Sequence, residues 1–537
     1  MKKSLIALMA LASLSSSAFS ADISNAEMMK QIEALKAQIA ALESKISNTE
    51  SATKKNKVSL EKMIKGESAT INDKRFKKLE KKVAKNYKKI NDVKTHDAND
   101  NIKWDVDFRT QFDNIQYEHA SGKKSKNNAL LTNRLWLGMG YSPDDNTIFK
   151  GLLSYNKAFG DTANHSQSNT NPGYANFDWV TNENALDNTL KVKEAYWLYK
   201  QATLFGSKVP WTVSVGRRPS TDGLGINLRA DQQRKSPLSH TVNVEFDGVS
   251  ARFDLDKITG VTGMWWKFCG GRGLTNAKPR FQNDGTDYAK DDSKNPDVDM
   301  AGFIFVPYDN GQYSIHTNYA RAFNLIGFTN TALGAYQAAY GAYMGSQNAT
   351  TAYNLQAATP AFNDVGDMDL ATIMFKAYGI GDGISDFLDD TTFFASAAMS
   401  KTHPNSKGML GSTSSETGYS FWIGANAPCP ISPDDARIGI EWNKGSKYWR
   451  SMTYGEDTMA GSKISARGNA WEIYRNAKIT DSLSWHLSYT YIKYDYTGSN
   501  AFFGAEGAPM TMAQAVGAGQ DPVEKAQDIK AYVRYRF

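Results

Sequence analysis

Cysteine is nearly absent from this sequence. The chain of 537 residues holds only two cysteines, Cys269 and Cys429, and neither belongs to a CxxC or CxxCH motif. A thioredoxin-like redox role and covalent haem attachment therefore have no support. An oxidised pair and two unpaired cysteines are equally compatible with the sequence, so their pairing stays open.

Long apolar runs are missing as well. The mean hydropathy is −0.51, and after the first segment of the chain no apolar run approaches the ~20 residues that a membrane-spanning helix needs. This excludes a helical membrane protein. It does not exclude a membrane β-barrel, because barrel strands alternate apolar and polar side chains and their hydropathy averages out. The 26 Tyr, 25 Phe and 12 Trp fit the aromatic girdles of such a barrel.

Recognisable catalytic motifs are also lacking. The seven histidines form no HExxH pair, and the sequence contains no GxSxG turn and no phosphate-binding loop. Each of these motifs places a nucleophile, a metal or a phosphate in a defined local structure. We therefore expect no enzyme activity, no catalytic residue, no bound metal and no cofactor.

The N-terminus has the pattern of a secretory signal peptide. Lys2 and Lys3 precede an apolar stretch from Leu5 to Leu14, and small residues at Ala18 and Ser20 suit cleavage after Ser20. The apolar stretch is too short for a membrane anchor, and no cysteine follows it that could carry a lipid. Residues 1–20 are therefore predicted to be removed on export.

Residues 21–98 are predicted to form a periplasmic, α-helical coiled-coil stalk. Apolar residues recur at the alternating three- and four-residue intervals of a heptad seam, which blurs between residues 49 and 66. The seam positions that we expect to mediate oligomerisation are Ile32, Leu35, Ile39, Leu42, Ile46, Phe76, Leu79, Val83, Asn86 and Ile90. Asn86 either sets the register of the helices or is a frayed position near the helix end. A seam this narrow needs a partner helix, either from another subunit or from a hairpin return of the same chain, and self-association is favoured.

The net charge of +6 is unevenly distributed. Residues 51–94 hold 15 basic and 5 acidic side chains, whereas residues 101–537 hold 42 basic and 44 acidic ones. The basic stretch is either a solvated helix face or a contact with an anionic periplasmic polymer such as peptidoglycan. Nucleic acid is not an expected partner in that compartment. The near-neutral balance of residues 101–537 says nothing about ion selectivity.

From Ile102 onward the period of the sequence changes to two. Ile102, Trp104, Val106 and Phe108 alternate with charged residues, which predicts a strand with one apolar and one charged face. Segments 131–141 and 149–155 alternate in the same way around a Pro-Asp turn, as does 483–491 after a short turn. Weaker strand candidates include 211–216, 242–255 and 470–475. Long polar stretches occur at 157–189, 272–298, 322–366 and 497–525.

Short turns that alternate with long polar stretches are typical of outer-membrane barrels. We therefore predict an all-β transmembrane barrel of about 14–18 antiparallel strands over residues 99–537. In such a barrel the apolar face of each strand contacts outer-membrane lipid and the polar face lines the lumen.

The end of the chain is the most specific feature. Ile529, Ala531, Val533 and Tyr535 alternate with polar residues up to a terminal Phe537. This resembles the C-terminal signal of bacterial outer-membrane barrels and implies recognition by the barrel-assembly machinery. The combination of signal peptide, basic coiled coil and barrel resembles a porin-like outer-membrane family that is known only as a domain of unknown function. The resemblance favours a trimer, because many porins are trimeric.

Charged and aromatic residues on the polar faces of the outermost strands are the candidate functional residues. If the first and last strands pair to close the barrel, their polar faces line the same wall. The predicted pore-lining residues are Lys103, Asp105, Asp107, Arg109, Arg134, Lys530, Tyr532, Arg534 and Arg536. Tyr336, Tyr340 and Tyr343 lie at helical spacing, which predicts a short helix that either folds into the lumen as a constriction or packs at the surface.

The function that fits these features is passive diffusion of small hydrophilic solutes or ions through an outer-membrane porin. The alternative is a structural anchor or surface-binding protein that uses the coiled coil to contact the cell wall. A porin that lacks residues 22–95 should still conduct, whereas a tether without them should lose envelope integrity.

Overall fold

The computed structural model describes residues 81–87, 89, 102–159, 190–235, 237–274, 297–360, 363–380, 383–453, 458–499 and 507–537. The chain divides into two compact units, Met1–Lys94 and Thr95–Phe537. In the first unit residues 81–87 are helical with exposed side chains, including Val83 and Asn86. The predicted signal peptide and the other eight seam positions lie outside the described residues. The coiled coil and its oligomeric state therefore remain predictions.

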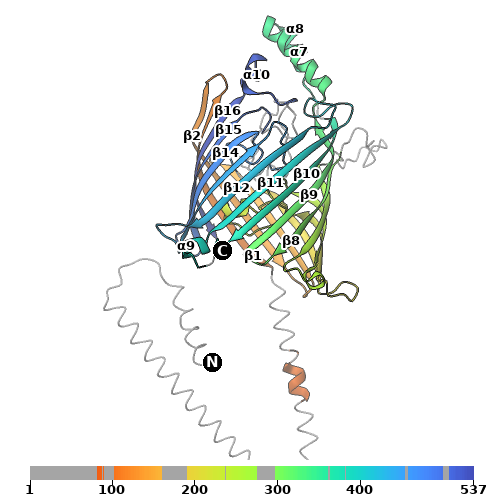
Figure 1. Cartoon of the computed structure of the whole chain (residues 1–537), viewed down its shortest axis with the longest axis vertical. Coiled ribbons are helices and arrows are strands. Elements are labelled where there is room, and N and C mark those ends of the chain that lie inside the picture. Colours follow the sequence, from red (N-terminus) through yellow and green to blue (C-terminus); the bar gives the residue numbers. More distant parts are fainter. Residues whose placement is uncertain are drawn as a thin grey trace, which may run out of the picture. The chain divides into compact units, whose positions relative to one another are not determined.

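The second unit is a closed antiparallel barrel of 16 strands (Figure 1). The strands are β1 (Lys103–His119), β2 (Lys124–Tyr141), β3 (Thr147–Ala158), β4 (Leu190–Gln201), β5 (Trp211–Arg218), β6 (Phe246–Asp254), β7 (Trp265–Leu274), β8 (Val298–Asp309), β9 (Tyr313–Gly327), β10 (Asn363–Tyr378), β11 (Thr392–Pro404), β12 (Thr417–Pro428), β13 (Ala436–Gly445), β14 (Gly468–Lys478), β15 (Leu483–Tyr494) and β16 (Val523–Arg536). Each strand pairs with its neighbours in sequence, and β1 pairs with β16, with Asp107 opposite Arg536. The predicted fold class and the pairing of the first and last strands are confirmed.

The period-two pattern sorts the side chains to the two sides of the wall. On β16 Lys530, Tyr532 and Arg534 are buried inside, while Ile529, Val533 and Tyr535 are exposed outside. The same apolar exposure recurs on β10, β12 and β14, for example at Ile373, Phe421 and Ile473. An exterior this apolar would be unfavourable in water and suits the hydrocarbon of a bilayer, where closure of the barrel also leaves no unpaired strand edge. The described helices include none with the length and apolarity to span a membrane.

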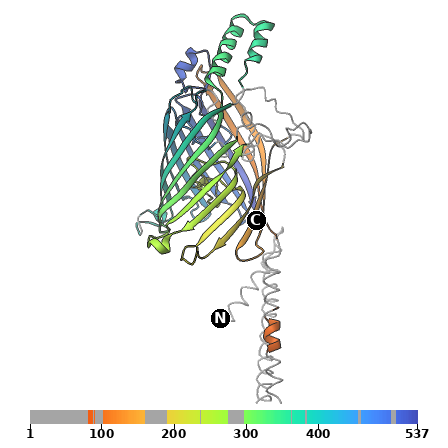
Figure 2. The same cartoon turned by 90° about the vertical axis from the view of Figure 1, so that its right-hand side faces the viewer.

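The connections differ in length between the two ends of the barrel. At the end that holds the C-terminus they are short, such as 142–146, 310–312 and 479–482, and the longest is 379–391, which contains α9 (Asp386–Asp389). At the opposite end most connections are longer than any at the turn end, and the exceptions are 120–123 and 405–416 (Figures 1 and 2). This end carries α7 (Asn330–Ser346), α8 (Ala349–Ala357) and α10 (Met512–Gly517). The predicted segregation of loop lengths is confirmed, and we refer to these as the turn end and the loop end.

Tyr336, Tyr340 and Tyr343 lie on α7, so the predicted helix is present. Of the two placements left open by the sequence, the constriction inside the lumen is wrong. Helices α7 and α8 form a hairpin that stands off the loop end of the barrel (Figure 2), and neither helix has a buried residue. Thr329 and Asn348 cap their N-termini by accepting bonds from Ala332 N and Thr351 N. Helical spacing identifies a helix but does not say on which side of the barrel rim it lies.

Candidate functional site: the barrel lumen and its two inner loops

Two of the connections from the loop end fold back into the lumen. The first inner loop, described at residues 219–235 and 237–245, joins β5 to β6 and contains α5 (Ile226–Arg229). The second inner loop, described at residues 446–453 and 458–467, joins β13 to β14. The first inner loop bonds inward side chains around most of the wall. Its contacts reach Asp107 on β1, Glu194 on β4, His316 on β9, Thr372 on β10, Ser396 on β11, Ser420 on β12, Glu472 on β14 and Arg534 on β16. A segment that touches strands on opposite sides of a barrel must cross its interior.

Apolar packing holds the first inner loop against one side of the wall. Leu224, Ile226 and Leu238 are buried in a cluster with Met374, Phe394, Trp422 and, from the second inner loop, Ile464. Gly225 adopts a left-handed φ of 101°, and a side chain there would collide with the ring of Trp422. Glycine is the residue that tolerates both this backbone and this approach. Burial of these side chains stabilises the docked loop by about 1.5–3 kcal/mol each.

A buried network of four charges joins the two inner loops to the wall. Arg229 from the first loop lies 3.0 Å from Glu472 and 3.6 Å from Glu441. Lys463 from the second loop lies 2.6 Å from Glu472 and also pairs with Glu441. The indole nitrogen of Trp422 donates to Glu441 at 3.1 Å. Because two cations meet two carboxylates, the network is neutral and its high cost of desolvation is offset by close pairing.

A second network anchors the base of the first inner loop. Lys193 on β4 lies 2.7 Å from Glu245, and Thr221 donates to the same carboxylate at 2.9 Å. Lys235 pairs with Glu194 and lies 3.8 Å from Asp222. These carboxylates raise the pKa of Lys235 above its ordinary value even though burial opposes this. Both ends of the loop are therefore tied to β4.

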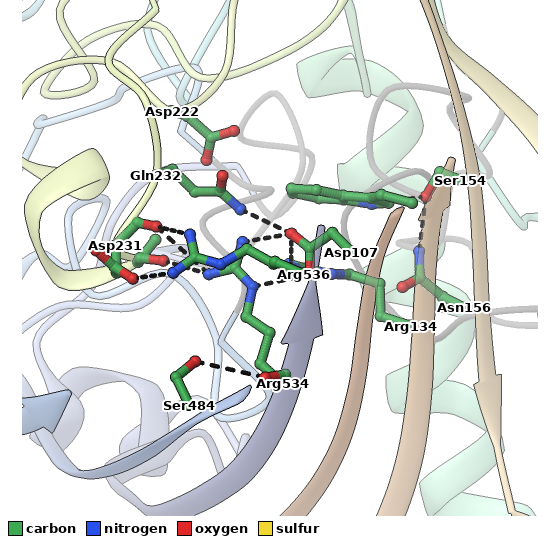
Figure 3. Close-up of polar contacts among 12 residues, drawn as sticks. Asp107, Arg134, Ser154, Asn156, Asp222, Asp231, Gln232, Ser484, Arg534 and Arg536 are labelled. Atoms are coloured by element: carbon green, nitrogen blue, oxygen red, sulfur yellow. Dashed lines mark hydrogen bonds and ion pairs between the residues drawn. The ribbon is translucent and has the colours of Figure 1, made fainter. Parts of the chain in front are cut away.

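The third network contains several of the predicted pore-lining residues (Figure 3). Arg534 Nε donates to Asp107 at 2.8 Å, and Arg134 lies 3.4 Å from the same carboxylate. Gln232 of the first inner loop donates to Asp107 at 3.3 Å. The guanidinium of Arg534 also donates to the carbonyl of Ala230 at 2.9 Å. This part of the loop is therefore attached to the wall formed by β1, β2 and β16.

The other predicted pore-lining residues are distributed as follows. Arg536 bonds Asp231 of the first inner loop (Figure 3), and Arg109 lies 5.0 Å from the ring centroid of Tyr532. Lys530 is buried, whereas Lys103 and Asp105 are exposed near the turn end and take no part in these networks. Their role in lining a pore remains a prediction. A cavity of about 230 Å³ at the turn end is bordered by Asp231, Arg534 and Arg536.

Sequence reasoning missed both inner loops. Residues 242–255 were expected to form one strand, but β6 begins at Phe246 and residues 242–245 belong to the first inner loop. Val242 and Val244 are buried, so their alternation arises from packing inside the lumen. One sequence signal is the presence of three cations, Arg229, Arg234 and Lys235, within seven positions of the connection between two strands. A cluster of like charges is usually solvated, so this signal did not indicate a buried loop.

The two cysteines are unpaired. Cys269 lies on β7 and is half-buried, and Cys429 directly follows β12 and is buried. Backbone hydrogen bonds from Ile431 and Ser432 hold the pKa of the Cys429 thiol below its ordinary value. Within the described ranges, no group of three or more His, Cys, Asp and Glu side chains is arranged to hold a metal ion.

His240 should make the docking of the first inner loop sensitive to pH. Its ring nitrogens lie 2.7 Å from Ser396 and 2.9 Å from Ser420, and burial lowers its pKa to about 3. The docked ring is therefore neutral, whereas an undocked ring is protonated below its ordinary pKa of 6.5. Docking should weaken by about 1.4 kcal/mol per pH unit as the pH falls from about 6.5 toward 3. Hydrogen exchange of residues 224–241, corrected for intrinsic rates, should be faster at pH 5 than at pH 7.

The matched control is His240→Gln, which keeps a polar side chain but cannot titrate. In this variant the difference in corrected exchange between pH 7 and pH 5 should shrink. If hydrogen exchange in the variant depends on pH as strongly as in the wild type, groups other than His240 cause the effect.

The fold and the lumen define a class: a closed 16-stranded transmembrane β-barrel with two of its own loops folded into the interior. Residues 124–537 match the family described as Protein of unknown function (DUF3373), and the chain belongs to this family. Comparison with curated protein sequences finds no significant match.

Among solved structures the chain is similar to several porins. The anion-selective porin from Comamonas acidovorans has a TM-score of 0.42 and 10% identity, with 81% of this chain and 99% of that chain covered. OprB of Pseudomonas putida has a TM-score of 0.42 and 11% identity, with 81% and 94% covered. OmpF of Salmonella typhi has a TM-score of 0.40 and 10% identity, with 82% and 99% covered.

Proposed function

We propose that the protein is an outer-membrane channel for the passive diffusion of small hydrophilic solutes or ions, with a bore that its two inner loops narrow. The barrel would lie with its turn end and N-terminal segment in the periplasm and its loop end outside, which is the usual arrangement of loop lengths in such barrels. The mechanism involves no covalent step. A solute would be selected by the width of the passage and by the charges beside it.

The observation that carries this proposal is the uneven packing of the lumen. On one side of the barrel, formed by β11–β16 and β1, the inner loops bury most of the inward side chains at the middle of the wall. Examples are Ser396, Glu472 and Asp528. On the side of β4–β7, several inward polar side chains stay partly exposed, including Tyr196 and Arg252. Partial exposure inside a barrel means contact with water. A narrow aqueous path beside the first inner loop is the feature that a diffusion channel requires.

The decisive experiment is conductance of the purified full-length chain in planar lipid bilayers. We expect discrete current steps, smaller than those of a barrel of this size with an empty lumen, because the two inner loops occupy much of the cross-section. Insertion must be checked independently, by the shift in gel mobility between heated and unheated samples that marks a folded barrel. Folded and inserted protein that never conducts would contradict the channel and favour an anchor whose lumen is plugged.

A further inference from the structure

Five basic side chains gather inside the lumen on the partly exposed side of the first inner loop. They come from β5, the loop itself, β6, β7 and β10, and they are Arg218, Arg234, Arg252, Lys267 and Lys376. Arg252 and Lys267 stand directly opposite each other in the pairing of β6 with β7. The charges of Arg218, Arg234 and Arg252 all act on Lys267, and that of Arg234 acts on Lys376. We call this set the basic cluster.

The basic cluster carries more positive charge than its acidic neighbours balance. Asp254 accepts two bonds from Arg252, at 2.9 and 2.7 Å, and Asp309 acts on Arg234 and Lys376. Glu194 acts on Arg218 but also pairs with Lys235, which lies outside the cluster. Burial and the charge of Arg252 lower the pKa of Arg234 despite the opposing effect of Asp309. The network of Arg229 and Lys463, by contrast, has one carboxylate for each cation. An anion bound in the basic cluster would relieve part of the repulsion among these cations.

Arg218 shows where such an anion would bind. Its Nη1 atom is buried and has no hydrogen-bond partner among the described residues, while its guanidinium lies 5.3 Å from the ring centroid of Tyr196. A buried donor without an acceptor costs about 1–3 kcal/mol. A carboxylate oxygen satisfies a guanidinium better than a halide does, because the planar fork matches the two oxygens.

A cavity of about 80 Å³ lies beside this donor. Arg218 and Lys267 border it, together with Asn318, and its remaining border is largely apolar. The apolar border comes from the first inner loop, β6 and β8, and includes Val242, Phe246 and Met300. The border of the cavity therefore combines two cations with apolar side chains that could contact a short alkyl group.

We propose that the basic cluster and this cavity form a binding site for small organic carboxylates on the diffusion path, with the carboxylate between Arg218 and Lys267 and a short alkyl part in the cavity. This inference rests on the proposed channel function and names the solute class. It implies that the channel prefers anions to cations and holds a short-chain carboxylate longer than chloride.

The test is a pair of measurements on full-length protein in planar bilayers. The reversal potential across a potassium chloride gradient should have the sign of an anion-preferring channel. Added butyrate should then reduce the chloride current at a concentration at least about threefold lower than acetate does, because butyrate buries two further methylene groups in the cavity. Arg218→Gln and Lys267→Gln should each raise the inhibitory butyrate concentration about three- to fivefold, the effect of one charge at close range in water.

The matched control is Lys444→Gln, which removes the same charge from an exposed position on β13 and should leave both measurements unchanged. Each variant is first checked for the heat-dependent gel shift of a folded barrel, and Arg252→Gln serves as the second cluster variant if Arg218→Gln does not fold. If the protein conducts but prefers cations, or if butyrate and acetate inhibit it equally, the proposed carboxylate site is wrong. The proposed channel function would stand in either case. Folded protein that never conducts would instead remove the channel function on which the site depends.

Discussion

Replacing residues 223–242 by a short glycine–serine turn should raise the single-channel conductance about threefold, since the passage widens toward that of an unobstructed 16-stranded barrel. The replacement is feasible because Arg218 and Phe246, the ends of β5 and β6, already pair with each other. The first inner loop crosses the lumen and bonds strands on opposite sides, so no other described connection should obstruct current as much.

The control for this deletion is removal of residues 331–358, the hairpin of α7 and α8. That hairpin has no buried residue and stands outside the lumen, so its loss should leave the conductance unchanged. Planar-bilayer recordings of the two deletions, made at the same salt concentration, give the comparison. Equal conductance in both variants would mean that the first inner loop does not lie in the current path.

Lys463→Met should destabilise the docked second inner loop by about 3–5 kcal/mol. Lys463 is fully buried and is shared between Glu441 and Glu472, which would be left with Arg229 as the remaining charged partner in this network. Burying a carboxylate without a cationic partner costs far more free energy than burying the complete ion pair. The expected readouts are a lower urea concentration for unfolding in detergent and faster hydrogen exchange of residues 458–467.

A double variant tests whether charge balance is the cause. Lys463→Met combined with Glu441→Gln again leaves one cation with one carboxylate, so it should recover part of the lost stability. Lys444→Gln, at an exposed position on the same strand as Glu441, should have no effect. If the double variant loses as much stability as the two single variants lose together, lost packing and not charge imbalance explains the result.

Local patterns were sufficient to predict the wall of the barrel. The alternation up to Phe537 predicted the inward position of Arg534 and the outward position of Val533, because a pleated strand directs successive side chains to opposite faces. The 16 strands lie within the predicted range of 14–18. The pairing of β1 with β16 followed from the need of a membrane sheet to have no free edge.

Local patterns failed where the chain folds back on the wall. The spacing of Tyr336, Tyr340 and Tyr343 identified α7 but not its position outside the lumen. The first inner loop carries no single period along its length, since its residues contact many different strands. Leu224 packs against Trp422, and Gln232 bonds Asp107, which is 125 positions away in the sequence.

By itself, the sequence determined the class of fold, the two faces of each strand and the segregation of loop lengths, because these depend on the period of two and on turn composition. The tertiary structure alone decided which charges meet. Residues 101–537 hold 42 basic and 44 acidic side chains. This near-neutral balance does not indicate whether a channel would prefer anions or cations. Closure of the barrel and insertion of the two inner loops pair some of these charges and place Arg218 and Lys267 beside one cavity. Electrostatic interaction depends on distance in space, and strand order and loop insertion set that distance.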